Sequence, residues 1–356
     1  MSTALALRFR KSAWCEHETV LVADDPHGIV LRGATVNRLS EEVISPELDG
    51  AERAAALFSP ALTQCLAKLS PDEIRRLDCR IDNFIDHERN DFPQILREAF
   101  PMLSLVPDPL LTDHTDDCGH SAFFERIIKA AEELRAGKSE RVLVGCVDSR
   151  CATSWLMAVR DEGILKDAIT PEGIIAGEAA GAVLLELEST ARKRNAAVLA
   201  VLAAWGRGTE TGLWYGSPPV TGRGLTEAFH QAFSSLDDGG KSITTIIADL
   251  NGERHRALDW AYAEGRIFSD AAVQERELRH PSFITGDCGG ATSAVILADA
   301  IGRLTFHPRF PGRIALATSD QSGARRVLCI EAGDVPDRCL LMQQIRTQTQ
   351  ENKTRK

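Results

Sequence analysis

Hydrophobic residues recur along this chain in two kinds of pattern, one typical of strands and one typical of helices. Continuous apolar runs, typical of strands buried on both faces, cover Arg141–Val147 and Ala179–Leu187. Apolar residues at helical spacing cover Ser121–Ala136, and Gly137 follows as the expected helix end. The same patterns predict further helices at Ala51–Leu69, Phe92–Phe100, Ser154–Arg160, Gly224–Leu236, His255–Glu264 and Gly290–Ile301, and further strands at Leu77–Ile85, Ala196–Trp205, Ile243–Leu250, Arg313–Thr318 and Arg326–Glu331. We expect Pro60 to split or kink the first of these helices. Strands that alternate with helices predict an α/β fold with largely parallel sheets.

Composition narrows the class of protein. The chain has 356 residues, of which 44% are hydrophobic and 26% charged, a balance typical of a globular protein with a sizeable core. No apolar run approaches the roughly 20 residues of a membrane span, which argues against an integral membrane protein. The first residues, MSTALALRFRKSAW, lack the apolar core and cleavage site of a secretion signal, so we expect a cytoplasmic protein. A formal net charge of -10 argues against non-specific nucleic-acid binding, which needs a basic surface.

The cysteines fit a reducing compartment. They number nine, an odd count, and form no Cys-x-x-Cys pair. We expect most of them to be reduced, buried thiols that pack as small hydrophobic residues. Only Cys118 and Cys288 lie in glycine-rich polar surroundings, and these two are candidates for a reactive thiol.

Five segments carry a more specific pattern. They are, in chain order, the helix Ser121–Ala136 running into RVLVGCVDS, then GIIAGEAAGAVLLELE (Gly173–Glu188), TTIIADLNGE (Thr244–Glu253), FITGDCGGATSA (Phe283–Ala294) and ATSDQSGARRVLCIEA (Ala317–Ala332). In this order they resemble the thiolase superfamily, specifically the β-ketoacyl-ACP synthases. The matching parts of a synthase are the nucleophile-elbow helix, a Gly-Glu-Gly-Ala turn before a long strand, the segments that deliver two catalytic histidines, and the last glycine-rich loop.

The resemblance implies a thiolase-like fold of five layers, α-β-α-β-α, built from two similar halves. We place the N-terminal half at residues 1–190, the C-terminal half at 191–342 and a disordered tail at 343–356. Members of the superfamily are usually dimers, so we expect a cytosolic homodimer.

A condensing synthase takes an acyl group from a pantetheine thioester onto a cysteine thiolate, which a helix N-terminus stabilises. Two histidines assist the reaction, and backbone N–H groups form the oxyanion hole. By the spacing of the synthases, the nucleophile position falls on His120, the first histidine on Asn251 and the second on Asp287. The oxyanion and turn glycines fall on Gly286 and Gly323.

Each of these substitutions changes the chemistry. An imidazole at the elbow cannot carry an acyl group as a thiolate does, and Asp287 is an anion where an enolate needs stabilising. Asn251 could still donate a hydrogen bond to a thioester carbonyl. Because the losses coincide at three positions that act together, we predict a non-condensing protein with a binding, accessory or chaperone role. It would need no cofactor or metal, and its partners would be an acyl-CoA or acyl-ACP pantetheine group, an acyl carrier protein or a protein client.

An active alternative remains open. If Cys118 is the elbow nucleophile, His120 lies beside it and could lower the pKa of the thiol. Asn251 would then polarise the thioester, and the protein would be an acyltransferase or β-ketoacyl synthase. This reading requires two extra residues in a helix whose end is well marked by Gly137.

Other patterns point to weaker hypotheses. Gly119–Phe123 resembles half of a serine-hydrolase elbow around Ser121, but its second glycine is missing. A dense group of ligand-type side chains has no recurrent zinc spacing; it consists of His114, Asp116, Asp117, Cys118 and His120. The glycines of 286–290 lack the spacing and lysine of a phosphate loop, and those at 206–208 are expected in a loop. Glu178 is expected to stabilise a glycine turn through backbone hydrogen bonds.

Overall fold

The computed structural model describes residues 13–40, 43–67, 69–85, 91–101, 103, 106, 110–113, 119–212, 218–268, 276–306 and 312–334. Its strands form two sheets, one of six strands in the order β1-β2-β6-β5-β3-β4 and one of five in the order β7-β11-β10-β8-β9. The first sheet contains β1 (Trp14–Ala23), β2 (Leu31–Asn37), β3 (Leu77–Asn83), β4 (Leu110–Asp113), β5 (Arg141–Ser149) and β6 (Ala176–Glu186). The second contains β7 (Ala200–Thr209), β8 (Ile243–Ala248), β9 (Glu277–Arg279), β10 (Arg313–Ser319) and β11 (Ala324–Ala332).

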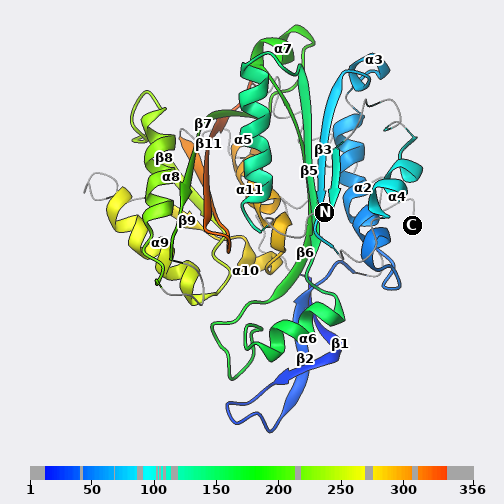
Figure 1. The fold of residues 1–356 in the computed structure, drawn as a ribbon, viewed down its shortest axis with the longest axis vertical. Coiled ribbons are helices and arrows are strands. Elements are labelled where there is room, and N and C mark those ends of the chain that lie inside the picture. The colour runs from blue at the N-terminus through cyan, green and yellow to red at the C-terminus, as the bar shows by residue number, and fades with distance from the viewer. Residues whose placement is uncertain are drawn as a thin grey trace.

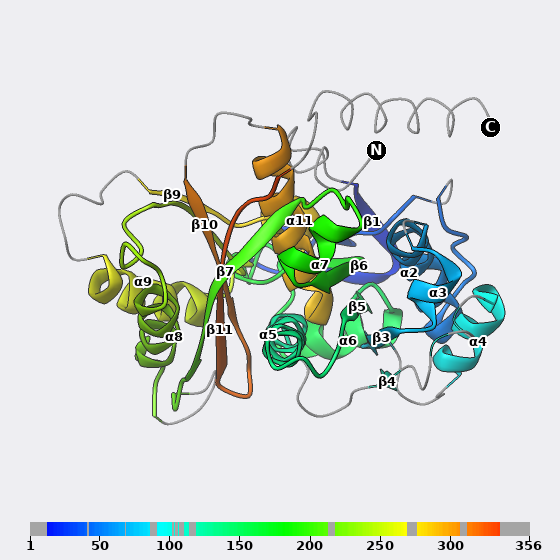
Figure 2. The same ribbon diagram turned by 90° about the horizontal axis from the view of Figure 1, so that it is seen from above.

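Helices lie on both outer faces and between the two sheets (Figures 1 and 2), which gives the expected α-β-α-β-α layering. The first sheet is covered on its outside by α2 (Gly50–Leu66), α3 (Pro71–Ile74) and α4 (Phe92–Ala99), and the second by α8 (Arg223–Ser234) and α9 (Arg254–Ile267). The central layer contains α5 (Ala122–Arg135) and α11 (Thr292–Phe306). Shorter helices are α6 (Thr153–Asp161), α7 (Glu188–Lys193), α10 (Ser282–Thr285) and the 3-10 turn η3 (Gly289–Ala291).

The two halves repeat one topology. Strands β6-β5-β3-β4 have the same order as β11-β10-β8-β9. In each half a central helix leads into an antiparallel hairpin-like pair, α5 into β5 and β6, and α11 into β10 and β11. The inner strand of each pair then lies parallel to β3 or β8. This internal duplication was expected from the resemblance, although the two halves are not alike residue by residue.

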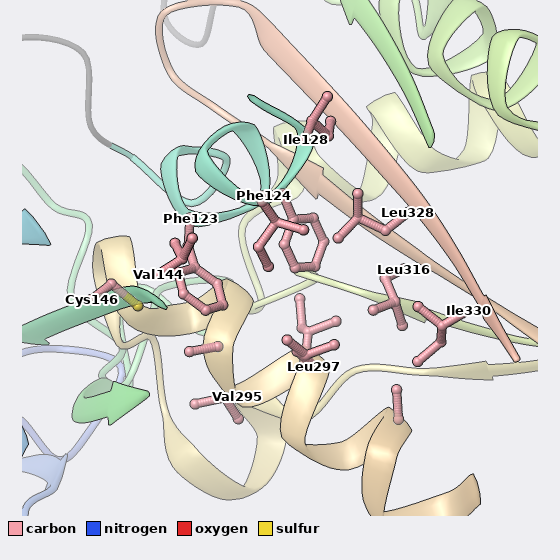
Figure 3. Close-up of a cluster of buried hydrophobic side chains, with 14 of the residues drawn as sticks. Phe123, Phe124, Ile128, Val144, Cys146, Val295, Leu297, Leu316, Leu328 and Ile330 are labelled. Atoms are coloured by element: carbon pink, nitrogen blue, oxygen red, sulfur yellow. The ribbon is translucent and has the colours of Figure 1, made fainter. Parts of the chain in front are cut away.

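The core between the sheets is apolar and close-packed. Figure 3 shows Phe123 of α5 beside Val144 of the first sheet, and Phe124 turned toward Leu297 of α11 and Leu328 of the second sheet. Burying one such side chain contributes about 1.5–3 kcal/mol. The helical spacing that predicted α5 therefore reflects a helix that meets apolar neighbours on two sides, and this packing fixes the position of the helix N-terminus.

Most predicted elements are present, but the sheets are mixed rather than largely parallel, because β1–β2, β5–β6, β10–β11 and β7–β11 pair antiparallel. Other differences concern single elements. Pro60 lies inside α2, which continues through it rather than dividing there. The strand predicted at Ala196–Trp205 lies four residues later, as β7, and therefore includes Gly206 and Gly208. The loop expected at these two glycines is wrong, because α8 packs against them: a Cβ on either would lie 1.9 Å from a backbone oxygen of α8. The strands β1, β2, β4 and β9 were not predicted.

No helix in the described ranges is long and apolar enough to cross a bilayer. The tail predicted at residues 343–356 lies outside the described residues.

Candidate functional site

His120 lies directly before α5 and is almost completely buried, with 1% of its surface exposed. Its ring joins two carboxylates. Nδ1 lies 3.0 Å from Oδ2 of Asp249, which follows β8, and Nε2 lies 3.0 Å from Oδ1 of Asp287, which precedes η3. The start of the central helix therefore meets a side chain from each of two other loops.

Asp287 is surrounded by donors. Its Oδ1 forms an ion pair with Nη1 of Arg150 at 3.0 Å and accepts the backbone N–H of Gly289 at 2.8 Å, besides its contact with His120. Its Oδ2 accepts from Nδ2 of Asn251. Although burial opposes ionisation, the charges of Arg150 and His120 hold the pKa of Asp287 well below its usual range. Asp287 is therefore a permanent anion.

Asp249 forms the matching half of the cluster. Its Oδ2 accepts from Nη1 of Arg256 at 2.7 Å and from the backbone N–H of Ser319 at 2.8 Å. Arg256 also donates from Nε to Oε2 of Glu253 at 2.8 Å. Burial raises the pKa of Asp249, but Arg256 and His120 outweigh it and lower that pKa overall. Glu253 behaves differently, because burial raises its pKa more than Arg256 lowers it.

Two contacts of 3.0 Å to carboxylates with lowered pKa values favour a His120 ring that carries two protons. A neutral imidazole has one N–H and one lone pair, and only the imidazolium donates from both nitrogens. Burial and the charge of Arg256 oppose this form, whereas Asp287 and the hydrogen bonds to Asp249 and Asp287 favour it, and the pKa of His120 is raised on balance. The ring therefore has no lone pair with which to act as a base or nucleophile.

Asn251 is also fully engaged. Its Nδ2 donates to Oδ2 of Asp287 and, at 2.8 Å, to Oε2 of Glu253, while its Oδ1 accepts the backbone N–H of Glu253 at 3.1 Å. Both amide hydrogens are used within the cluster. The hydrogen bond to a thioester carbonyl that the sequence suggested for Asn251 would require one of these contacts to break.

The structure thus brings His120, Asn251 and Asp287 into one connected cluster. Cys118 lies outside the described residues, as do His114, Asp116 and Asp117 of the suggested ligand group. Across the described part of the chain, no group of three or more metal-ligating side chains could hold an ion.

Cys288 follows Asp287 and is completely buried, with its Sγ near the carbonyl oxygens of Thr285 and Gly286. Burial raises its pKa, so the thiol is not ionised near neutral pH. The same is true of the half-buried Cys65 and of the other buried cysteines described, which are Cys79, Cys146, Cys151 and Cys329. None of these thiols is an activated nucleophile.

The remaining predicted positions have turn roles. Gly286 has φ 72°, and a Cβ there would lie 2.8 Å from the carbonyl oxygen of Ala176, so the loop passes too close to β6 for any side chain. Gly323 closes the turn between β10 and β11, where its N–H donates to the carbonyl oxygen of Asp320. Ser121 begins α5 and donates from Oγ to the carbonyl oxygen of Ala324 at 3.3 Å.

The sequence matches no protein-family profile and no curated protein. Solved structures match it by shape. A structure of a type II polyketide synthase acyl-carrier protein in complex with its ketosynthase (AntDE:AntF) aligns with a TM-score of 0.69 at 14% identity, covering 93% of this chain and 94% of that one. A β-ketoacyl synthase from Burkholderia phymatum STM815 gives 0.68 at 14% identity over the same shares. An oxazolomycin ketosynthase domain of Streptomyces albus JA3453 gives 0.69 at 14%, covering 93% of this chain and 72% of that one.

This chain has the thiolase-like fold of the ketosynthases. The shape match covers 93% of the chain, whereas the segments that first suggested it lie between Ser121 and Ala332. At this identity the likeness establishes the fold and leaves the chemistry to the residues present. Within the ketosynthase-like fold, those residues are an imidazolium, an amide and a carboxylate that bind one another.

Sequence reasoning missed three charged members of the cluster, Arg150, Asp249 and Arg256. Each lies at the end of a strand or the start of a helix rather than within a recognised motif. The sequence does contain a signal for Asp249: a carboxylate follows the apolar run of β8 and lies two residues before Asn251. It contains none for Arg150, since its partner Asp287 is far away in the sequence. Arg256 lies near its partners Glu253 and Asp249 in the sequence but belongs to no recognised motif.

Proposed function

We propose that this protein is a non-condensing member of the ketosynthase-like fold, which acts by binding rather than by carbon–carbon bond formation. The observation that carries the proposal is His120, placed at the start of α5 between Asp249 and Asp287 with both ring nitrogens engaged. A side chain held in this way cannot attack a thioester, because it has no free electron pair.

The charge of the cluster supports the same conclusion. Condensation passes through an enolate, which needs a positive or hydrogen-bond-donating neighbour. Asp287 presents a carboxylate instead, and two like charges about 4 Å apart repel by about 4 kcal/mol at the effective dielectric constant of a protein. A negatively charged intermediate next to Asp287 would therefore be destabilised.

The partner proposed for this binding role is a pantetheine-borne acyl group or the acyl carrier protein that presents it. Support comes from the fold, which one acyl-carrier-protein complex shares with this chain. A protein client is the other candidate. We also propose that the protein is a cytoplasmic homodimer, which light scattering after size-exclusion chromatography would test.

Intact-protein mass spectrometry tests the loss of chemistry. The wild-type protein, Cys118→Ala and the control Cys288→Ala would be incubated with acyl-CoA and acyl-ACP donors. We expect no acyl adduct on any of the three and, in a parallel titration, saturable binding of acyl-ACP. An adduct on the wild type and on Cys288→Ala that disappears in Cys118→Ala would overturn the proposal, and would identify an acyltransferase that uses Cys118.

A further inference from the structure

We infer that His120 is a pH-sensitive clasp between the two halves of the fold, closed while its ring carries two protons and released when it loses one. The inference concerns the same cluster as the proposed function but does not depend on what the protein binds. It rests on the elements to which Asp249 and Asp287 are hydrogen-bonded, and on the protonation state in which the His120 ring can donate to both carboxylates.

Asp287 is anchored to the first sheet. Its backbone N–H donates to the carbonyl oxygen of Ile175 at 2.7 Å, and its carbonyl oxygen accepts from the N–H of Gly177, in β6, at 2.9 Å. Its carboxylate forms an ion pair with Arg150, which follows β5. Although residue 287 belongs by sequence to the second half, its backbone is hydrogen-bonded to the first sheet.

Asp249 is anchored to the second sheet. It directly follows β8, and its carboxylate accepts the backbone N–H of Ser319 at the end of β10. Arg256 of α9 binds it from the outer layer and also donates to the carbonyl oxygen of Ser319. His120, at the start of the central helix, is therefore a link between a carboxylate on one sheet and a carboxylate on the other.

Both contacts require donation. When the ring loses one proton, one of its nitrogens presents a lone pair to a carboxylate oxygen 3.0 Å away, which turns an ionic hydrogen bond into a repulsion. The ring can then hold Asp249 or Asp287 but not both. In this buried setting the lost contact is not replaced by water, so the link between the sheets weakens.

Other charged groups face this cluster from each packed element. They are Asp148 and Arg150 from β5 and its end, Glu253, His255, Arg256 and Asp259 from α9 and its start, and Asp320 and Arg325 from the β10–β11 turn and β11. Burial and Arg256 lower the pKa of His255 to about 3, so it stays neutral. Burial raises the pKa of Asp148 to about 6 and also raises the pKa values of Glu253 and Asp259.

The direction in which stability changes with pH follows from the pKa of His120. His120 has a raised pKa in the folded protein, so its stabilising contribution is complete below the unfolded value of 6.5 and is lost as the pH rises through the folded value. Within that window the folded state holds one proton more than the unfolded state. The unfolding equilibrium constant therefore rises by up to about tenfold per pH unit.

Urea unfolding of the full-length protein between about pH 6 and pH 10 would test the clasp. We expect wild-type stability to fall across this range. The variant His120→Asn should be less stable at pH 6 and approach the wild type at the alkaline end. It should keep only the part of the slope that the buried cysteines supply, because their raised pKa values also make stability fall at alkaline pH. Two control variants should keep the part of the slope that His120 supplies. Glu253→Gln removes a neighbouring carboxylate whose pKa is also raised, so it shows whether Glu253 rather than His120 causes the slope. Glu178→Gln changes a buried ion pair that contains no histidine.

A second measurement covers the case in which His120→Asn does not fold. The ¹⁵N resonances of selectively labelled histidine in the wild-type protein report the protonation of each ring nitrogen. We expect one buried ring to be doubly protonated at neutral pH and to lose a proton only above pH 6.5. A neutral tautomer for His120 at pH 6, or a slope unchanged in His120→Asn, would overturn the inference. Neither result bears on whether the protein forms an acyl adduct.

Discussion

Two buried ionic networks lie in this molecule, and they are built on different principles. In the first, Arg53 of α2 forms a fork with Glu178 of β6, from Nε to Oε2 at 2.8 Å and from Nη2 to Oε1 at 2.6 Å. The backbone N–H of Leu39 and the hydroxyl of Ser149 complete the shell of the carboxylate. One cation meets one anion. The sequence predicted backbone hydrogen bonds for Glu178, but the structure gives one from Leu39, and an unpredicted arginine supplies the main contacts.

The second network, around His120, contains more groups and is less completely paired. Glu253 has one carboxylate oxygen, Oε1, that is buried without a hydrogen-bond partner. Several of its members have pKa values raised by burial or by their partners. The Arg53–Glu178 pair therefore holds its carboxylate without a histidine. By contrast, the contact of His120 with both Asp249 and Asp287 depends on a proton of the ring.

The largest expected effect comes from removing an arginine. Arg256→Leu would leave Asp249 and Glu253 without a buried cation that binds both. Breaking a buried pair in this way costs about 3–5 kcal/mol, which urea unfolding at pH 7 would measure. Arg53→Leu should cost a similar amount, but only Arg256→Leu should shift the titration of His120. Equal histidine titrations in the two variants would remove the distinction between the networks.

A second effect concerns Asp148, a buried carboxylate that accepts the N–H of Gly290 at 2.7 Å. Because burial raises its pKa from 3.8 to about 6, the folded state binds its proton more tightly than the unfolded state. The contribution of Asp148 to stability should therefore fall as the pH rises from about 4 to 6. Asp148→Asn should remove that contribution, so the difference in stability between the variant and the wild type should change across this range, as followed by thermal unfolding. An unchanged pH profile would mean that Asp148 is ionised throughout.

A third effect tests the packing at the start of α5. A Cβ on Gly119 would lie 2.3 Å from Oδ2 of Asp320. Gly119→Ala should therefore cost about 1–3 kcal/mol through overpacking, and Asp320→Gly in the same chain should recover most of it. Gly265→Ala is the matched control, because α9 leaves open space at that position. There the change should stabilise the helix by up to about 1 kcal/mol.

The smallest effect is a single hydrogen bond in the closed pair. Ser149→Ala removes the hydroxyl that donates to Oε2 of Glu178 at 2.8 Å. Since Arg53 still binds that oxygen, we expect a loss of only about 1 kcal/mol. Chemical unfolding would show it, with no change in pH dependence between pH 6 and 9. A loss as large as that of Arg53→Leu would mean that the pair is not closed without the serine.

Spacing along the chain located His120, Asn251 and Asp287, because they follow elements whose apolar patterns are clear. It could not locate their partners. His120 meets Asp249 and Asp287 across 129 and 167 positions of sequence, and nothing local to any of the three residues encodes those contacts. The strands β1 and β2 were missed for a related reason: they form a hairpin that is largely exposed, so their alternation is weak.

The sequence by itself determined the periodic elements, the order in which they alternate and the loss of a cysteine from the position where spacing places the nucleophile. These are local properties, since side-chain period and residue identity are read within one segment. Only the tertiary structure decided that an imidazole, an amide and a carboxylate would bind one another, and that the imidazole would hold two protons. Those properties depend on the distances between charges and on the exclusion of water, and both arise only when the two sheets close around α5.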